Sequence, residues 1–231
     1  EFTTLDPQKL PAVADINFCT NIFDGLVALD ENGQVVPKLA TDWVASEDGL
    51  HYTFHLREGV KFHNGEEMTS EDVKYSLERC IANPGVNYNY LIIESITCDD
   101  DYTVTIKTSA PFNALLYRLS LDAASIICKS ADTSAEEFNK NPVGTGPFKF
   151  VSWELGGDVV LEAFEDYWGG APAVKRVIFR TIPEALNRTI GLETGEVDWP
   201  MTWASPTWRA WRTTRPSPPS PPPAPPCGMW A

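Results

Sequence analysis

Alternating apolar and polar side chains give the clearest strand signal in the sequence. Residues 52–57 read YTFHLR, and Gly49 and Gly59 flank the run. A period of two predicts a half-buried strand. A shorter apolar run at 26–29 stops at the sequence DENG, in which Asn and Gly tolerate a positive φ, so it predicts a strand followed by a hairpin turn.

Apolar residues at every fourth position predict a helix that begins at about Thr69. Val73, Leu77 and Ile81 form the repeat. Thr69 and Asp72 have the spacing of a capping box, in which the third helical residue caps the first backbone amide. An Asn-Pro-Gly sequence then ends the helix.

The remaining elements mix strands and helices without a regular strand–helix–strand rhythm. Strands are expected at 92–97, 102–108, 125–128, 148–153, 159–164 and 174–180, and helices at 111–121, 134–140 and 184–194. Gly195 is expected to end the last helix. This mixture indicates an α/β or α+β fold with mixed sheets.

Residues 201–231 differ in composition from the rest of the chain. They hold nine of the 19 prolines and four of the eight tryptophans, with three arginines and no acidic residue. We interpret the segment as extended or disordered polyproline, or as the product of a reading-frame shift near residue 200. A third interpretation makes it a ligand for SH3-like or WW-like grooves, as in an adaptor protein.

Residues 1–200 are strongly acidic. Without the three tail arginines, 15 of the 18 basic residues remain against 32 acids, a net charge of −17. This charge repels nucleic-acid phosphates and anionic lipid surfaces, so we expect no nucleic-acid partner. The sequence has no apolar run long enough to span a membrane and no signal segment, and it begins at Glu1, so we expect that a leader was removed or that the sequence is a fragment.

Cysteine and histidine spacing predicts neither a disulfide framework nor a metal site. The five cysteines form no CxxC pair, and we expect small buried side chains, with a bridge from Cys80 to Cys98 left open. His51 and His55 would share a strand face about 13 Å apart, too far for two ligands of one ion. We therefore expect structural histidines and no bound metal.

No catalytic pattern is present either. The motifs GxSxG and HExxH are missing, and adjacent acids such as Glu66 and Glu67 point apart, whereas hydrolysis needs two carboxylates that face one another. We expect a protein that is not an enzyme and has no catalytic residues. A secreted hydrolase is the alternative from that class.

Nine short motifs, taken in order, resemble the family 5 solute-binding proteins of ABC importers. They are TLDP at 4–7, NIFDGL at 21–26, VPKLATDW at 36–43, YTFHLREGVKF at 52–62, NG at 64–65, TSEDV at 69–73, PVGTGPF at 142–148, YW at 167–168 and GEVD at 195–198. Each motif alone is weak, but their order and spacing are specific. The family includes oligopeptide-, dipeptide- and nickel-binding components of these importers.

The resemblance implies a clamshell like the type II periplasmic binding proteins, in which two lobes close on a ligand. It places one α/β subdomain of the first lobe at 1–43 and 131–200, and an inserted β-rich subdomain at 44–130. Residues 201–231 stand where the second lobe would continue, so we expect that lobe to be missing from this chain.

The resemblance also implies a function. The protein would capture peptides or similar small solutes outside the cytoplasmic membrane and deliver them to an ABC permease, without a cofactor. We expect a monomer that is periplasmic or held at the outer side of the membrane by a lipid anchor. A nickel chelate, a sugar or an opine is the alternative ligand.

Three segments supply the candidate ligand contacts. They are Thr20, Asn21 and Phe23, then Tyr88, Asn89 and Tyr90, and finally Gly144, Thr145 and Gly146. Aromatic and amide side chains suit the walls of a peptide pocket, and glycine permits a close approach of the backbone to a ligand. Packing in the core is the other interpretation of Phe23, and a structural turn is the other interpretation of the glycine loop.

Overall fold

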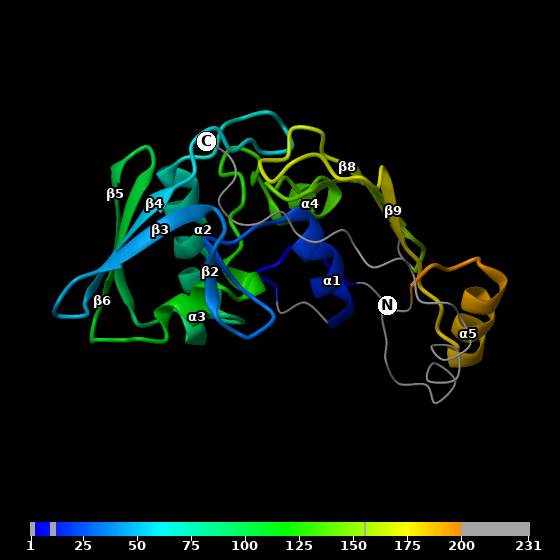
Figure 1. Cartoon of the computed structure of the whole chain (residues 1–231), viewed down its shortest axis with the longest axis horizontal. Helices are drawn as coiled ribbons and strands as arrows, with labels where there is room; N and C mark the ends of the chain where they lie inside the picture. Colours follow the sequence, from blue (N-terminus) through cyan, green and yellow to red (C-terminus); the bar gives the residue numbers. More distant parts are fainter. Residues whose placement is uncertain (1–2, 10–12, 155, 200–231) are drawn as a thin grey trace. The chain divides into compact units, whose positions relative to one another are not determined.

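The computed structural model describes residues 3–9, 13–154 and 156–199 (Figure 1). The proline-rich segment 201–231 lies outside the described residues. The chain divides into two compact units, residues 1–181 and residues 182–231. The subdomain boundaries expected from the sequence, at 43, 130 and 200, stay a prediction.

A four-stranded antiparallel sheet forms one half of the first unit. Its strands, in spatial order, are β3 (Ala40–Ala45), β4 (His51–Leu56), β6 (Thr103–Thr108) and β5 (Ile93–Asp100). In β4 the side chains of Tyr52, Phe54 and Leu56 are buried, whereas His55 is exposed. The predicted alternation is confirmed, because one face of a strand covers the core and the other meets solvent.

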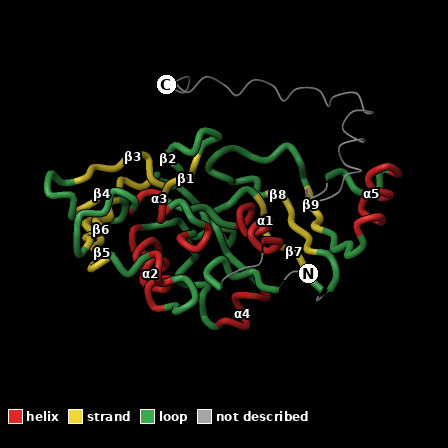
Figure 2. Tube along the Cα trace, turned by 90° about the horizontal axis from the view of Figure 1, so that it is seen from below, coloured by secondary structure: helices red, strands yellow, loops and turns green. Residues whose placement is uncertain are grey.

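The helix α2 (Ser70–Ala82) packs against β5 and β6 of this sheet (Figure 2). Its apolar repeat is buried through Val73 and Leu77. The Asp72 carboxylate accepts a hydrogen bond from the Thr69 backbone N–H at 3.0 Å. The predicted helix and its N-terminal capping residues are therefore confirmed.

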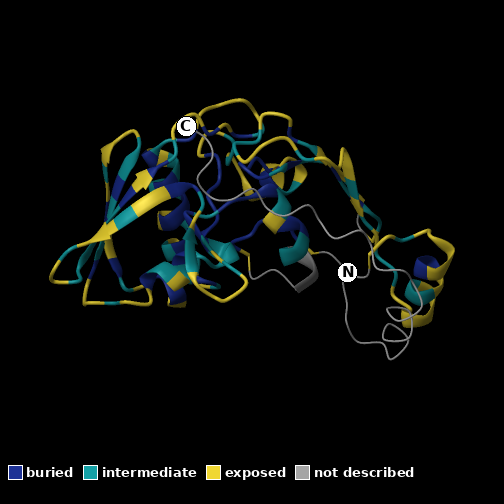
Figure 3. Ribbon diagram, viewed as in Figure 1, coloured by how far each residue is buried: buried dark blue, intermediate teal, exposed yellow. Residues whose placement is uncertain are grey.

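A second core lies around a three-stranded antiparallel sheet. The strands, in order, are β7 (Phe148–Trp153), β8 (Val159–Ala163) and β9 (Arg176–Phe179). The helix α1 (Val13–Ile22) packs against β7. Phe18 and Ile22 are fully buried in this core with Val159 and Leu161. Figure 3 colours the chain by burial, with the buried positions in dark blue.

The remaining elements of the first unit are short. They are β1 (Val27–Leu29), which pairs with β2 (Val35–Pro37), the 3₁₀ turns η1 (Asn87–Asn89) and η2 (Asp122–Ala124), and the helices α3 (Leu115–Leu119) and α4 (Ala135–Lys140). In the second unit, α5 (Ala185–Thr194) ends at Gly195 with φ +78°, as predicted. The mixed α/β class is confirmed.

The structure differs from the predicted elements at one strand and one helix, and it decides the disulfide bridge that the sequence left open. Residues 125–128 form no strand. The Ile126 N–H donates to the Asp24 carbonyl, and the Cys128 N–H donates to the Val143 carbonyl. These two hydrogen bonds go to different segments, so they do not form the ladder of a β-sheet. The helix α1 has no counterpart among the predicted elements. Cys80 and Cys98 are both free, so the bridge between them does not form.

Within the described ranges, none of the helices has the length and apolar character needed to cross a membrane.

Candidate functional site

A buried carboxylate, Asp24, joins loops that are distant in sequence. It follows the end of α1, and its side chain is only 1% exposed. The Lys38 ammonium lies 2.8 Å from Oδ1, while Thr145 Oγ1 and Trp168 Nε1 donate to Oδ2 at 3.1 and 2.9 Å. A buried charge requires such partners, so this cluster fixes the end of α1 in place.

The glycine loop packs directly on the backbone at the end of α1. A Cβ atom at Gly144 would lie 2.1 Å from the Ile22 carbonyl oxygen, and one at Gly146 would lie 2.6 Å from the Asn21 carbonyl oxygen. Gly146 N–H also donates to the Ile22 oxygen at 2.9 Å. All three loop residues are buried, and the close approach that glycine permits here is to the protein itself. Their contact with a ligand stays a prediction.

His63 holds the other side of the glycine loop. Its Nδ1 accepts from Gly144 N–H at 3.4 Å, so the proton stands on Nε2, which donates to the Gly146 carbonyl at 2.9 Å. The ring meets Phe164 edge-on. Burial lowers the pKa of His63 from 6.5 to about 4, so the imidazole is neutral at pH 7.

The other two histidines lie beside acids on the surface of the four-stranded sheet. His55 Nδ1 contacts Asp42, and His51 Nδ1 lies 3.9 Å from Asp48. In the part of the chain that the structure describes, no three His, Cys, Asp or Glu side chains gather as a metal site requires.

A cavity of about 220 Å³ lies beside the end of α1 in the first unit. It is lined by Thr20, Phe23, Gly25, Val27, Ala28, Leu29, Lys38, Ser120, Leu121, Asp122 and Ser125. Two of the predicted contact residues, Thr20 and Phe23, are therefore brought together here. The buried Phe23 ring serves both the core and the cavity wall.

Two charged side chains line this cavity. Lys38 is 28% exposed and is paired with Asp24. Burial raises the pKa of the Asp122 carboxyl, and the neighbouring Lys38 partly offsets that rise. A cation therefore lies near a partly dehydrated acid, in a lining that also holds five apolar side chains: Phe23, Val27, Ala28, Leu29 and Leu121.

The other predicted contact residues do not line the cavity. Asn21 donates to the Asn17 carbonyl at 2.7 Å, within α1. Tyr88 is 67% exposed, whereas its neighbours Asn89 and Tyr90 are buried. Asn89 accepts from the Arg118 guanidinium, and the Tyr90 hydroxyl donates to the Arg118 carbonyl at 3.2 Å. Their role as ligand contacts stays a prediction.

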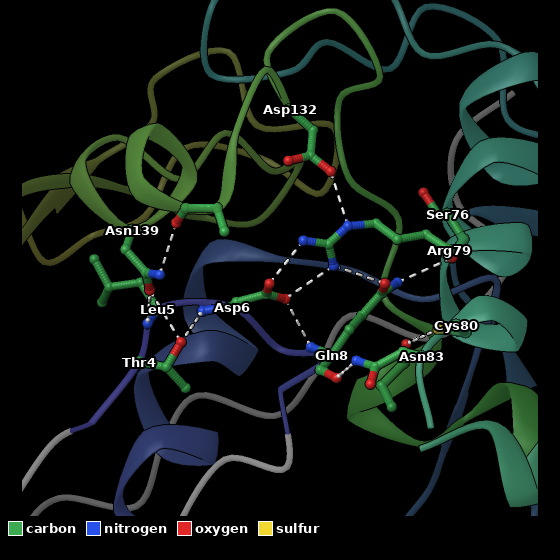
Figure 4. Close-up of polar contacts among 12 residues, drawn as sticks. Thr4, Leu5, Asp6, Gln8, Ser76, Arg79, Cys80, Asn83, Asp132 and Asn139 are labelled. Carbon is green, nitrogen blue, oxygen red and sulfur yellow. Dashed lines mark hydrogen bonds and ion pairs between the residues drawn. The ribbon is translucent and has the colours of Figure 1, made fainter. Parts of the chain in front are cut away.

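A guanidinium on α2 ties the N-terminal segment to the rest of the first unit (Figure 4). Arg79 donates to both oxygens of the buried Asp6, at 3.1 and 2.7 Å, and its Nε lies 2.8 Å from Asp132. Gln8 accepts from the same guanidinium at 2.8 Å. Such a bidentate pair fixes both distance and angle, so it holds the chain that leads into α1.

The charged residues of these clusters were not among the site residues predicted from the sequence. Asp24 and Lys38 lie inside motifs that carry the family resemblance, and so does Asp6. The motifs mark these residues as characteristic of the family, but they do not show which residues bind one another. Thr145, for example, binds Asp24 across a separation of 121 residues. Asp122 lies in none of the motifs, and only the folded chain places it in a cavity wall.

The family model for bacterial extracellular solute-binding proteins, family 5 Middle, matches residues 34–218. The glutathione-binding protein GsiB of Pectobacterium atrosepticum is 34% identical over 201 residues, which cover 84% of this chain and 39% of that protein. The chain thus spans about two-fifths of the length of this curated relative.

Solved structures give the same match in three dimensions. The periplasmic binding protein DppA from Helicobacter pylori, in complex with the peptide STSA, has a TM-score of 0.76 and 33% identity, covering 84% of this chain and 43% of that one. NikZ from Campylobacter jejuni, in complex with Ni(L-His), has a TM-score of 0.77 and 30% identity, covering 85% and 40%. The fold is that of part of a type II periplasmic binding protein, and the chain belongs to the bacterial extracellular solute-binding proteins of family 5.

Proposed function

We propose that this chain is the N-terminal part of the solute-binding component of an ABC importer, which captures peptides or similar small solutes outside the cytoplasmic membrane. The observation that carries the proposal is the match to DppA, a relative solved with a bound peptide, at 33% identity over 84% of this chain. The cavity beside α1 contributes one wall of the solute site. The bound solute is then delivered to a membrane permease.

The composition of the cavity supports binding without covalent chemistry. Phe23, Val27 and Leu121 supply apolar surface, and Lys38 and Asp122 supply a small number of oriented charges. Sites for small molecules typically combine apolar walls with a few polar groups that set orientation. We propose that the protein is a monomer, because a single copy supplies all the residues that line this cavity. We also propose that it acts in the periplasm, either free or held at the membrane by a lipid anchor.

Thermal unfolding of the purified chain tests the binding function. The panel is glutathione, the peptide Ser-Thr-Ser-Ala and Ni(L-His), which represent the solutes named for the relatives. A solute that binds only the native state adds about 2.7 kcal/mol of stability at 100 times its Kd. We expect a peptide to raise Tm in a dose-dependent way. If Ni(L-His) alone does so, the solute is a metal chelate. No shift with any solute at about 10 mM contradicts the proposal.

A further inference from the structure

The sequence contains two Asn-Gly steps, at 32–33 and 64–65, and both lie in the same kind of turn. In each turn the glycine N–H donates to the carbonyl three residues before it, at 3.0 Å for Gly33 and 2.9 Å for Gly65. Each glycine also has a positive φ, +75° and +89°. Because the two backbones match, a difference in reactivity between the two steps must come from the asparagine side chains and their surroundings.

An Asn-Gly step can deamidate, because glycine has no side chain to keep the neighbouring amide away from its nitrogen. The glycine nitrogen bonds to Cγ of the asparagine, its proton passes to the amide nitrogen, and ammonia leaves. Water then breaks the resulting imide ring at one of its two bonds to that nitrogen. Cleavage at Cγ gives Asp, and cleavage at the main-chain carbonyl gives isoaspartate. In both turns the glycine N–H must first leave its acceptor carbonyl, so the reaction requires local opening.

The Asn64 amide is held by hydrogen bonds that reach another segment of the chain. Its Nδ2 donates to Glu66 Oε1 at 3.1 Å and to Cys128 Sγ at 3.5 Å, and its Oδ1 accepts from the Glu66 N–H at 3.1 Å. In the same turn, the His63 N–H donates to the Gly144 carbonyl at 2.9 Å. Both the amide and its turn are therefore fixed to the rest of the first unit.

The Asn32 side chain is exposed in the turn between β1 and β2. Its amide contacts the Asp30 carboxylate within that turn, and among the described residues it forms no hydrogen bond with another segment. The hairpin is a two-stranded ribbon that pairs at three positions. Such a ribbon is only marginally stable by itself, so its turn should open more easily than the turn at 62–66.

We propose that Asn32 is a spontaneous modification site, where water converts the side-chain amide to Asp and isoaspartate, and that the fold protects Asn64 from the same reaction. This inference is independent of the proposed function. The product adds a negative charge next to Glu31. Its isoaspartate form also adds a methylene to the main chain between β1 and β2, and all three residues of β1 line the cavity.

The test ages the full chain at mildly alkaline pH and follows both sites by peptide mapping with mass spectrometry, while isoaspartyl methyltransferase labels the isoaspartate product. We expect residue 32 to lose its amide at least about tenfold faster than residue 64, because the hydrogen bonds of Asn64 must break first. In urea the two rates should become similar. Equal rates in the native chain, or an intact Asn32 in the native chain, overturn the proposal.

Two variants test the two sites separately. Asn32→Gln should stop the reaction at residue 32, because the longer side chain closes the ring far more slowly, and it should leave residue 64 unchanged. Glu66→Ala removes an acceptor of the Asn64 amide and should raise the rate at residue 64 alone. Glu78→Ala, at an exposed acid of α2, is the matched control and should change neither rate.

Thermal melting shows whether the Glu66→Ala chain is folded. An unchanged rate at residue 64 in the folded variant contradicts the protection of Asn64. If that variant does not fold, the comparison of the native and urea-unfolded chain still decides the proposal.

Discussion

At the scale of single residues, the first unit depends on contacts that tolerate no added atom and no added charge. Gly144 lies against the Ile22 carbonyl, and His63 accepts a backbone N–H through an imidazole that must stay neutral. Both residues hold the loop whose Thr145 binds Asp24. Substitution of either residue should therefore lower the free energy of unfolding more than it changes solute affinity.

Gly144→Ala should destabilise the chain by about 2–3 kcal/mol. The new Cβ would lie 2.1 Å from a backbone oxygen, and backbone atoms move less easily than the end of a side chain. The change is measured by urea unfolding. Gly157→Ala serves as the control, because its added Cβ would come no closer than 3.1 Å to another atom, and it should cost well under half as much. Equal costs would contradict the packing described for the glycine loop.

His63 should make stability fall with acid. Its folded-state pKa of about 4 lies below the value of 6.5 expected in the unfolded chain, so the unfolded state binds the proton first. Stability is therefore lost as pH falls from 6.5 towards 4, and from pH 7.5 to pH 5 the loss should be about 2 kcal/mol. Urea midpoints at the two pH values measure it. His63→Gln should flatten the dependence by that amount, and an unchanged slope would refute the assignment.

At the scale of elements, α2 connects the N-terminal segment to the core. Its buried residues pack against the four-stranded sheet, and Arg79 on the same helix reaches Asp6 and Asp132 (Figure 4). The guanidinium also lies 5.1 Å from the Phe138 ring of α4. One side chain therefore stabilises three segments.

Arg79→Met should cost about 3–5 kcal/mol, because it leaves the Asp6 carboxylate buried without its partner. Calorimetric unfolding gives the value. Lys140→Met removes an exposed ion pair with Glu136 within α4 and should cost about 0.5 kcal/mol or less. If the two variants lose the same stability, the buried ion pair is not the feature that holds the N-terminal segment.

Elements with a strong local pattern could be predicted from the sequence. The alternation in β4 and the four-residue repeat in α2 both follow from one buried face, so they were predicted correctly. The helix α1 was missed, since its residues Asn17 and Thr20 do not favour helix and it relies on burial of Phe18 and Ile22 in the second core. Residues 125–128 were assigned to a strand because Ile126 and Ile127 are apolar, but both are buried without a ladder.

The candidate site was less accessible to sequence reasoning than the fold. Thr20 and Phe23 were expected and do line the cavity, but the charged residues of the same lining, Lys38 and Asp122, were not predicted. Lys38 and Asp122 are brought into one cavity lining only by the tertiary fold. The spacing of apolar and polar residues within one element does not predict a contact of that kind. The sequence motifs therefore marked individual residues, whereas the contacts between those residues follow only from the tertiary structure.

At the scale of the whole molecule, the first unit contains nearly all of the buried apolar side chains among the residues that the structure describes. The two cores draw their residues from positions 5 to 161, with Val177 and Phe179 packed against the second. A fragment of residues 1–181 should therefore fold alone, with a Tm within about 5 °C of the full chain. Circular dichroism melting measures this. A fragment without a cooperative transition would contradict the independence of the first unit.

The most direct test of the account is to map where a solute touches the chain. Backbone amide NMR shifts are followed while alanylalanine is added, and the affected positions are placed on the structure. The account predicts that the largest changes cluster at the cavity wall, at Phe23, Gly25 and the segment 120–125. Changes confined to the outer strands β5 and β6, or none at saturation of the titration, would contradict it.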